Sequence, residues 1–204
     1  TAKNVTMYRV QNGGMFGGHI VVPCTITSGS AETGEITSRS NIDGGGYSMG
    51  GLVGKTEGLL TVSASKSDTP DESGTPVNVK NICINGASDV KLEKDSYAGG
   101  LAGYAASADI SDVTVDTAKI AGKNLGGVIG GVGSASMQNV TVKNSRLANC
   151  KDGNGYGRLN VGGLAGTVTG SLNGFNILSK GNIIGYLIKN SAIQSGNFSS
   201  KDFD

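Results

Sequence analysis

The pentapeptide Gly-Gly-Leu-Ala-Gly occupies residues 99–103 and returns at residues 162–166. Variants of the same form, two glycines, two apolar residues and a glycine, lie at residues 13–17, 50–54 and 126–130, and a degenerate copy lies at 181–185. We call this pattern the glycine phrase. Its recurrence indicates a protein that stacks one small structural unit on the next. The residues expected to define the repeat are Gly50, Gly51, Leu52, Gly54, Gly99, Gly100, Leu101, Gly103, Gly126, Gly127, Val128, Gly130, Gly162, Gly163, Leu164 and Gly166.

A second signature accompanies the phrase. It reads apolar, polar, Asn or Asp, apolar, small, apolar, at residues 79–84, 110–115 and 137–142, with a looser copy at 172–177. The alternation at its end is typical of a half-buried strand. We expect Asn81, Asp112 and Asn139 to stack at a turn, because Asn and Asp tolerate left-handed backbone geometry there.

Together the two signatures predict an all-β chain, a right-handed parallel β-helix (β-solenoid). Polar inserts at residues 65–76 and 148–158 account for the uneven spacing, and residues 28–48 are expected to form a long surface excursion. Without the inserts, each unit is about the length of one solenoid rung, and stacked rungs share one core. Helices are disfavoured, since each interior glycine costs about 1 kcal/mol relative to alanine. Residues 1–204 then form a single domain of about five or six irregular repeats, a segment of a longer surface protein.

The phrase contains two consecutive apolar residues, which a regular strand would place on opposite sides. Either a bulge at the glycines turns both residues inward, or one apolar row faces outward and needs cover from another layer. The sequence leaves both alternatives open.

Composition narrows the classes of function. Charged residues make up 16% of the chain and the net charge is +1, so the sequence offers no electrostatic footprint for nucleic acid. No apolar run is long enough for a transmembrane helix, which argues against membrane insertion. Glycine, serine, threonine and asparagine dominate the polar residues, as in secreted bacterial β-proteins. The start at Thr1 without a signal peptide is expected of a mature or excised segment.

The three cysteines are Cys24, Cys83 and Cys150. Their odd number and wide spacing fit neither a disulfide framework nor a zinc site. Cys83, between two isoleucines, is expected to be a small buried thiol on a strand. Whether Cys24 and Cys150 pair stays open.

Catalytic signals are weak. His19 is the one histidine, which excludes an H-E-x-x-H metallopeptidase site, and no acid or nucleophile lies near it in the sequence. A β-helix polysaccharide hydrolase or lyase would need paired carboxylates. Asp109, Asp112 and Asp116 are the candidates, but the first two are expected to face opposite sides, and Asp112 occupies the repeat's Asn position. We therefore expect no enzyme, no catalytic residue and no cofactor.

A metal site is not expected either. Asp152 and Asn154 are ligand-type residues within the stretch 152–155, but that stretch lacks the spacing and the terminal glutamate of an EF-hand loop.

The phrases resemble the GLUG motif, a glycine-rich repeat named for its Gly-Leu-any-Gly core. The match runs from about Gly13 to Gly185. Proteins with such repeats are typically large bacterial surface or secreted proteins, among them adhesin-like proteins and the non-catalytic region of zinc metallopeptidases that cleave immunoglobulin A1. The resemblance implies an extracellular stalk or adhesive segment and supplies no catalytic residues. Many family copies carry a cysteine after the Asn, whereas this chain has that arrangement once, at Cys83.

We therefore expect a non-catalytic extracellular module, secreted or at the bacterial cell surface. It would bind a host glycoprotein, glycan or matrix ligand through loops on a rigid scaffold, and contact other domains of the same chain. The ligand-binding candidates are Tyr104, Tyr156, Asp152 and Asn154, with tyrosine offering area and a hydrogen-bonding tip. One alternative is a structural spacer that holds another domain away from the cell. The other is the polysaccharide enzyme.

Overall fold

The computed structural model of the chain describes residues 1–38, 46–65, 74–86, 96–149 and 160–186. Over these residues the chain is all-β, with no helix, so the predicted fold class is confirmed at that level. The strands of the first part are β1 (Ala2–Val10), β2 (Asn12–Gly13), β3 (Gly17–Ile20), β4 (Cys24–Thr27), β5 (Ser30–Ser38), β6 (Ser48–Gly50), β7 (Val53–Ser63), β8 (Val77–Asn85) and β9 (Tyr97–Gly99). Those of the second part are β10 (Ala102–Asp116), β11 (Lys119–Gly122), β12 (Asn124–Gly126), β13 (Ile129–Lys143), β14 (Arg146–Asn149), β15 (Asn160–Gly162), β16 (Ala165–Val168), β17 (Leu172–Lys180) and β18 (Ile183–Tyr186).

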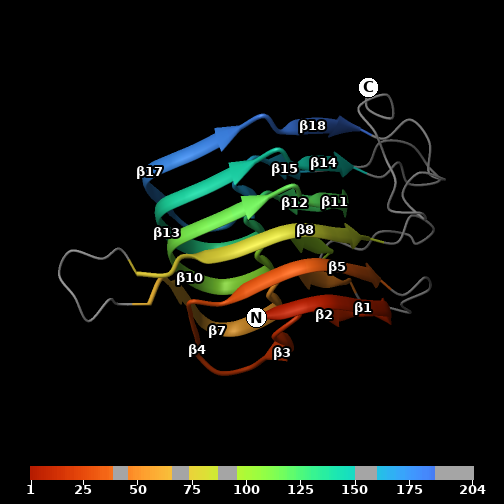
Figure 1. Cartoon of the computed structure of the whole chain (residues 1–204), viewed down its shortest axis with the longest axis horizontal. Coiled ribbons are helices and arrows are strands. Elements are labelled where there is room, and N and C mark those ends of the chain that lie inside the picture. Colours follow the sequence, from red (N-terminus) through yellow and green to blue (C-terminus); the bar gives the residue numbers. More distant parts are fainter. Residues whose placement is uncertain (39–45, 66–73, 87–95, 150–159, 187–204) are drawn as a thin grey trace.

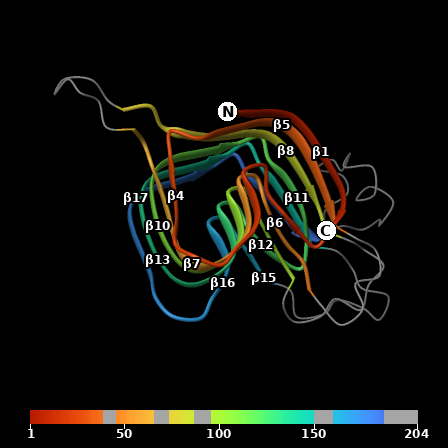
Figure 2. The ribbon, with the colours of Figure 1, turned by 90° about the horizontal axis from the view of Figure 1, so that it is seen from below.

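The strands lie in two sheets, one of 13 strands and one of five, and the described pairings are parallel. Each strand pairs with its counterpart one repeat later, so the strands stack in layers (Figure 1). Seen along the stack, successive repeats follow nearly the same contour (Figure 2). This arrangement places equivalent residues of each repeat directly above one another.

The stack presents five faces, which the chain visits in the same order in each repeat. The first face holds the beginnings of β1, β5 and β8 and the ends of β10, β13 and β17, and the second holds the ends of β1, β5 and β8 with β11, β14 and β18. The third face is the five-stranded sheet of β2, β6, β9, β12 and β15. The fourth holds β3, β16 and the beginnings of β7, β10 and β13, and the fifth continues these long strands beside β4 and β17.

Left-handed residues form the corners on either side of the first face. Between the fifth and first faces, Ser28, Asp112, Asn139 and Asn176 have φ between 53° and 56°. Between the first and second faces, Asn4, Thr33, Asn81, Thr117 and Asn144 have φ between 53° and 57°. Within β1, β5, β8, β10, β13 and β17 the left-handed residue bends the strand without ending it, whereas Ser28, Thr117 and Asn144 lie between two strands. The predicted left-handed geometry of Asn81, Asp112 and Asn139 is therefore confirmed.

The predicted stacking of Asn81 with Asp112 and Asn139 is wrong. Val79 pairs with Val115, and Lys80 with Asp116, so Asn81 lies at the corner of Thr117. The two corners have similar sequences and stand only five residues apart, and the insert at 65–76 interrupts the first corner in this repeat. The looser copy at 172–177 is also out of register. The signature predicted that its third residue, Gly174, would stand opposite Asn139. Ile177 instead pairs with Val140, so Asn176 stands opposite Asn139, two positions later.

The glycine phrase is a bend between the third and fourth faces, and this resolves the question of its two apolar residues. Leu52 and Val53 are at most 1% exposed, as are their counterparts in the next two repeats. The carbonyl of Leu101 accepts hydrogen bonds from the N–H groups of both Leu52 (2.9 Å) and Val53 (3.2 Å). The backbone therefore turns at this point, as the first alternative requires, and both side chains enter the core.

The positions predicted for two copies of the glycine phrase are wrong. Gly17 pairs with Val53, so the first copy is shifted by one residue and Phe16 is the counterpart of Leu52. The degenerate copy at 181–185 is not a phrase, because Ile183 pairs with Arg146 on the second face. Gly181 instead occupies a corner position, with φ 66°.

In the described part of residues 28–48, where a surface excursion was expected, the chain is mostly a strand. Residues 30–38 form β5, which pairs with β1 and β8 and buries Ala31 and Ile36 completely. Its serines, threonines and glutamates lie mostly on the outer side, so the composition resembles that of a loop while the strand still contributes to the core. Residues 39–45 lie outside the described part.

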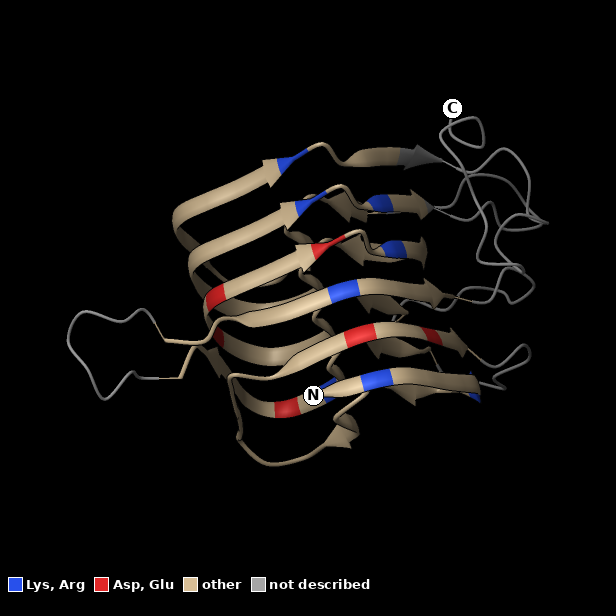
Figure 3. Ribbon diagram, viewed as in Figure 1, with Lys and Arg blue, Asp and Glu red and all other residues tan. Residues whose placement is uncertain are grey.

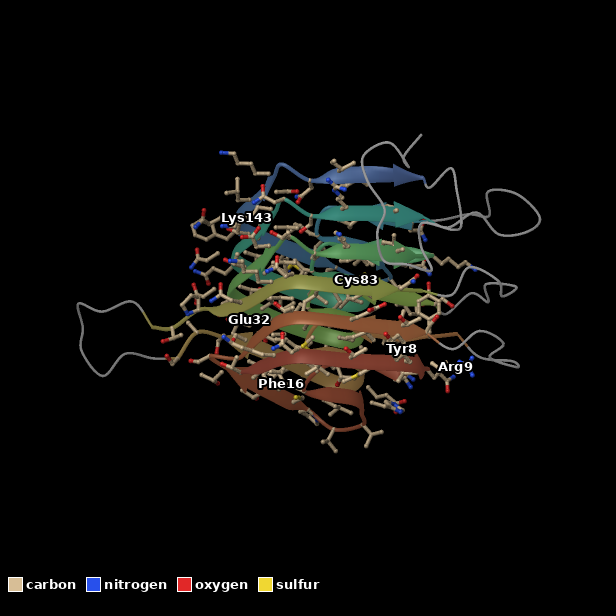
Figure 4. All side chains as sticks on the ribbon, turned by 45° about the vertical axis from the view of Figure 1, so that its right-hand side comes forward. Tyr8, Arg9, Phe16, Glu32, Cys83 and Lys143 are labelled. Atoms are coloured by element: carbon tan, nitrogen blue, oxygen red, sulfur yellow. The ribbon has the colours of Figure 1, made fainter. Side chains whose placement is uncertain are left out.

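Cys83 lies on β8, as predicted, but its side chain is only half-buried. Ile82 and Ile84 point into the core, and alternation turns Cys83 toward the outer side (Figure 4). Burial raises the pKa of its thiol to about 11, and the carboxylate of Glu35 acts in the same direction. Within the described residues, Cys24 and Cys83 form no disulfide, while Cys150 lies outside them.

Candidate ligand-binding groove

The bend at the glycine phrase folds the contour inward, so the third and fourth faces meet back to back near its tip (Figure 2). A Cβ atom on Gly103 would contact the backbone nitrogen of Met49 and lie 2.5 Å from the carbonyl oxygen of Gly54. A Cβ on Gly130 would lie 2.5 Å from the backbone nitrogen of Ala98. The last glycine of the phrase is therefore required by close backbone approach, and not by a positive φ.

Two rows of side chains flank this inward bend. One row stands two residues before the first phrase glycine and consists of Ser48, Tyr97, Asn124 and Asn160. The other directly follows the last phrase glycine and consists of Lys55, Tyr104, Gly131 and Thr167. Because both rows repeat with the phrase, they run along the stack on either side of the bend, and we call the space between them the groove.

Toward the C-terminal repeats, hydrogen bonds between the rows close the groove. Asn160 donates from Nδ2 to Asn124 Oδ1 (2.8 Å) and to Thr167 Oγ1 (3.1 Å). Thr167 Oγ1 lies 3.2 Å from Asn124 Oδ1, and Asn124 in turn donates to the carbonyl of Ser96 (2.9 Å). These polar groups are satisfied by one another.

Toward the N-terminal repeats, the groove opens into a pocket of about 410 Å³. It is lined by Gln11, Asn12, Gly46, Ser48, Lys55, Tyr97 and Tyr104. The rings of Tyr97 and Tyr104 have centroids 5.1 Å apart and planes inclined by 42°. A Cβ on Gly131 would contact the ring of Tyr97, so the missing side chain there makes room for the tyrosine pair.

The charge of Lys55 at this pocket is balanced by its own neighbour. Glu57 Oε1 accepts hydrogen bonds from Lys55 Nζ (3.0 Å) and from His19 Nε2 (2.9 Å). The hydrogen bond from Lys55, followed by that from His19, holds the pKa of Glu57 below its ordinary value. The pocket therefore offers aromatic, amide and hydroxyl groups with little net charge. His19 therefore has an acid beside it in space, although Glu57 is 38 positions away in the sequence.

Two of the three aspartates considered for catalysis, Asp112 and Asp116, form hydrogen bonds at the corners. Asp112 Oδ1 accepts from Asn139 Nδ2 (2.8 Å), whose Oδ1 accepts from Asn176 Nδ2 (2.8 Å). Asp116 Oδ1 accepts from Asn144 (3.1 Å) and from Thr117 (2.9 Å). Asp109 lies exposed on β10. The left-handed backbone at Asp112 invalidates the simple alternation argument that placed it opposite Asp109.

Of the predicted ligand-binding residues, Tyr104 lies in the pocket, and Tyr156, Asp152 and Asn154 lie outside the described residues. Tyr97 was missed, although the sequence carries a signal for it: a residue with a polar group stands two positions before the first glycine in the phrases at 50, 99, 126 and 162.

The described residues lack two further features. They contain no group of three or more His, Cys, Asp or Glu side chains that could hold a metal ion. No described segment forms a helix with the length and apolar character needed to cross a membrane.

Comparison of the chain with protein-family models, curated proteins and solved structures finds no match.

Proposed function

We propose that this chain is a right-handed β-solenoid of the GLUG type and serves as a non-catalytic, glycan-binding module of a bacterial surface or secreted protein. The parallel strands and the fixed order of faces support the solenoid. The tyrosine-lined pocket is the observation on which glycan binding rests. Five of its seven lining residues lie on strands, so the stack positions most of the pocket.

The lining of the pocket matches the chemistry of a sugar ring. A pyranose has C–H groups that pack on an aromatic face and hydroxyls that both donate and accept hydrogen bonds. Tyr97 and Tyr104 supply aromatic area and phenolic tips. Gln11, Asn12 and Ser48 add amide and hydroxyl groups that donate and accept. Since Glu57 pairs with Lys55, a neutral glycan fits better than a charged one.

A glycan array tests this proposal with the double variant Y97A/Y104A. We expect specific binding of the unmodified chain, weakened by about fivefold to 150-fold in the variant, as the loss of two aromatic contacts worth about 0.5–1.5 kcal/mol each would give. The matched control is Y8A, which removes a tyrosine that is 66% exposed on β1. Equal binding by the double variant and by Y8A would contradict the proposed site. If the unmodified chain bound no glycan on the array, the proposal of glycan binding would itself be contradicted.

A structural spacer is the second candidate, and the corner ladders favour it. The side chains of Asp112, Asn139 and Asn176 are linked along the stack by hydrogen bonds of 2.8 Å, which stiffen it in that direction. A spacer binds nothing on the array and tolerates shortening of the inserts at 65–76 and 148–158. The polysaccharide enzyme has less support, because Asp112 and Asp116 are engaged in the corners.

A further inference from the structure

The two rows that flank the groove have one member in each of five repeats. The first row begins at Asn12, which pairs with Ser48, and the second begins at His19, which pairs with Lys55. Each repeat therefore contributes one pair of side chains, one from each side of the bend. Along the stack these pairs are Asn12 and His19, Ser48 and Lys55, Tyr97 and Tyr104, Asn124 and Gly131, and Asn160 and Thr167.

From the tyrosine pair onward, protein side chains occupy the groove. The rings of Tyr97 and Tyr104 meet across it, with centroids 5.1 Å apart. A Cβ on Gly131 would collide with the ring of Tyr97 and lie 3.2 Å from that of Tyr104, so the two rings take up the space beside this glycine. In the last pair Asn160 donates a hydrogen bond to Thr167 (3.1 Å). The tyrosine rings are therefore the end wall of the pocket on the side of the C-terminal repeats.

At the first two pairs the groove is left to the pocket. Lys55 Nζ and His19 Nε2 both bind Glu57 Oε1, at 3.0 Å and 2.9 Å, which holds these two side chains along the fourth face. Strands β2 and β3 come first in their faces, so no strand of the described ranges stands beyond Asn12 and His19. The pocket is thus closed at the tyrosines and open at the opposite end.

We propose that this pocket takes the end of a glycan chain, with the terminal sugar against the tyrosine pair and the rest of the chain leaving past Asn12. This inference rests on the proposed glycan function. A chain that passed through the groove would need the space beside Gly131 and Thr167, which protein side chains occupy. From Asn12 to Tyr97 the first row advances by two strand spacings, about 10 Å, which suits a short chain end and not an extended polymer.

The walls of the pocket favour a neutral terminal hexose. The five strands of the third face contain no Lys, Arg, Asp or Glu, whereas the first and second faces carry charged residues along the stack (Figure 3). On the other wall, Glu57 neutralises Lys55. A sugar acid would lose hydration of its carboxylate here without gaining a cation that is not already paired within the described walls. Terminal glucose, galactose or mannose therefore fits better than a terminal sugar acid.

Competition on the glycan array tests this inference with neutral oligomers of glucose, galactose and mannose. Each series runs from the dimer to the hexamer and includes its soluble polymer. We expect the affinity for the series that binds to level off by the trimer and then stay within about twofold, because units outside the pocket make no further contact. The polymer should compete in proportion to the number of its chain ends and not to its mass.

Two variants at opposite ends of the groove provide a matched comparison. N12W narrows the open end and should weaken binding about tenfold or more, because the added ring clashes with an entering sugar. N160A/T167A removes the hydrogen bond beyond the tyrosine pair and should stay within about twofold of the unmodified chain, because the bound chain end does not reach it. Thermal midpoints of both variants separate a loss of binding from a loss of fold.

Recognition of a chain end would be overturned by affinity that rises with every unit up to the hexamer, by competition in proportion to polymer mass, or by equal weakening in N12W and N160A/T167A. If binding in those cases were still lost in Y97A/Y104A, the proposed glycan function would stand without end recognition. Array binding that none of the three series competes for would overturn the neutral hexose end. No binding by the unmodified chain would contradict both proposals.

Discussion

The last glycine of each phrase lies against the backbone of the neighbouring face, where a methyl group has no room. At Gly103 the obstacles are the backbone atoms of Met49 and Gly54, which no side-chain rotation can move. The substitution therefore has to displace one face from the other. This is a steric requirement for glycine, distinct from the conformational preference at Gly181, where φ is 66° and other repeats carry Asn or Thr.

We expect Gly103→Ala to lower the free energy of unfolding by about 1–3 kcal/mol, the usual range for overpacking a tight interior. Urea denaturation measures the change. Gly174→Ala is the matched control, because a Cβ there would meet only the side chain of Ile177, at 3.1 Å, on an exposed strand. The control should change stability by less than about 1 kcal/mol. Equal stability of Gly103→Ala and the unmodified chain would refute the back-to-back contact.

Asn139 combines two roles at its corner, and two substitutions separate them. It holds φ at 53° and links Asp112 to Asn176 through its side-chain amide. Asn139→Ala loses both roles and should cost about 2–3 kcal/mol, from left-handed strain of about 1–2 kcal/mol and lost hydrogen bonds. Asn139→Gly keeps the backbone geometry and should cost about 1 kcal/mol less. If alanine proved no worse than glycine in chemical denaturation, the left-handed corner would be wrong.

The sequence predicted which corner residues have left-handed geometry, but it did not predict which of them stack at the same corner. Asn and Asp at Asn81, Asp112 and Asn139 indicate left-handed geometry at each position taken alone. Two corners only five residues apart carry the same preference, so composition does not decide which corner Asn81 joins. Similarly, Gly13-Gly14 and Gly17-Gly18 allow two registers for the first phrase, and strand pairing selects one.

At the scale of the element, the strand ends on the first face are tied together by Asp116. Burial acts against its ionised form, but hydrogen bonds from Asn144 and Thr117 and the charge of Lys143 outweigh it and lower the pKa of Asp116 below its ordinary value of 3.8. A carboxyl group with a lowered folded-state pKa stabilises the fold above its unfolded pKa. That contribution disappears as the pH falls through the folded-state value.

Asp116→Asn should therefore be less stable than the unmodified chain at pH 7, by about 1 kcal/mol or less for a surface network. The difference should shrink as the pH falls below about 3.8, the ordinary pKa of the group. Unfolding free energies measured between pH 7 and pH 2 test this, with the exposed Asp109→Asn as the control. A difference that stayed constant across this range would show that the Asp116 carboxylate gains nothing from its neighbours.

Elements were predicted best where apolar alternation was strong. The strands around Ile82, Val113 and Val140 follow from alternating residues that all prove buried. Strand β5 was missed because serine and threonine fill its outer side, although Ala31 and Ile36 supply the inner one. The tyrosine pocket was half predicted: Tyr104 was a candidate, whereas Tyr97 approaches it through the inward bend, which depends on contacts between distant backbones.

At the scale of the whole molecule, stability comes from each repeat covering the next. Leu52, within the stack, is fully buried, whereas its counterpart Phe16 in the first repeat is 45% exposed. The same position thus gains its burial from a neighbour and not from its own repeat, as expected where one unit cannot bury its apolar side alone. The parallel stack also fixes the positions of the two rows that flank the tyrosine pocket, since both rows consist of equivalent residues in successive repeats.

The distance between Ser30 and Leu178 tests the stack most directly. Pairing runs from Ser30 through Asn78, Thr114 and Thr141 to Leu178, so four strand spacings of about 4.8 Å separate two residues that are 148 positions apart in the chain. Spin labels attached at Ser30→Cys and Leu178→Cys, with the three native cysteines replaced by serine, report this distance by double electron–electron resonance spectroscopy. The parallel stack predicts one population with a backbone separation of about 19 Å. A broad distribution, or a separation well beyond the height of five stacked strands, would contradict it.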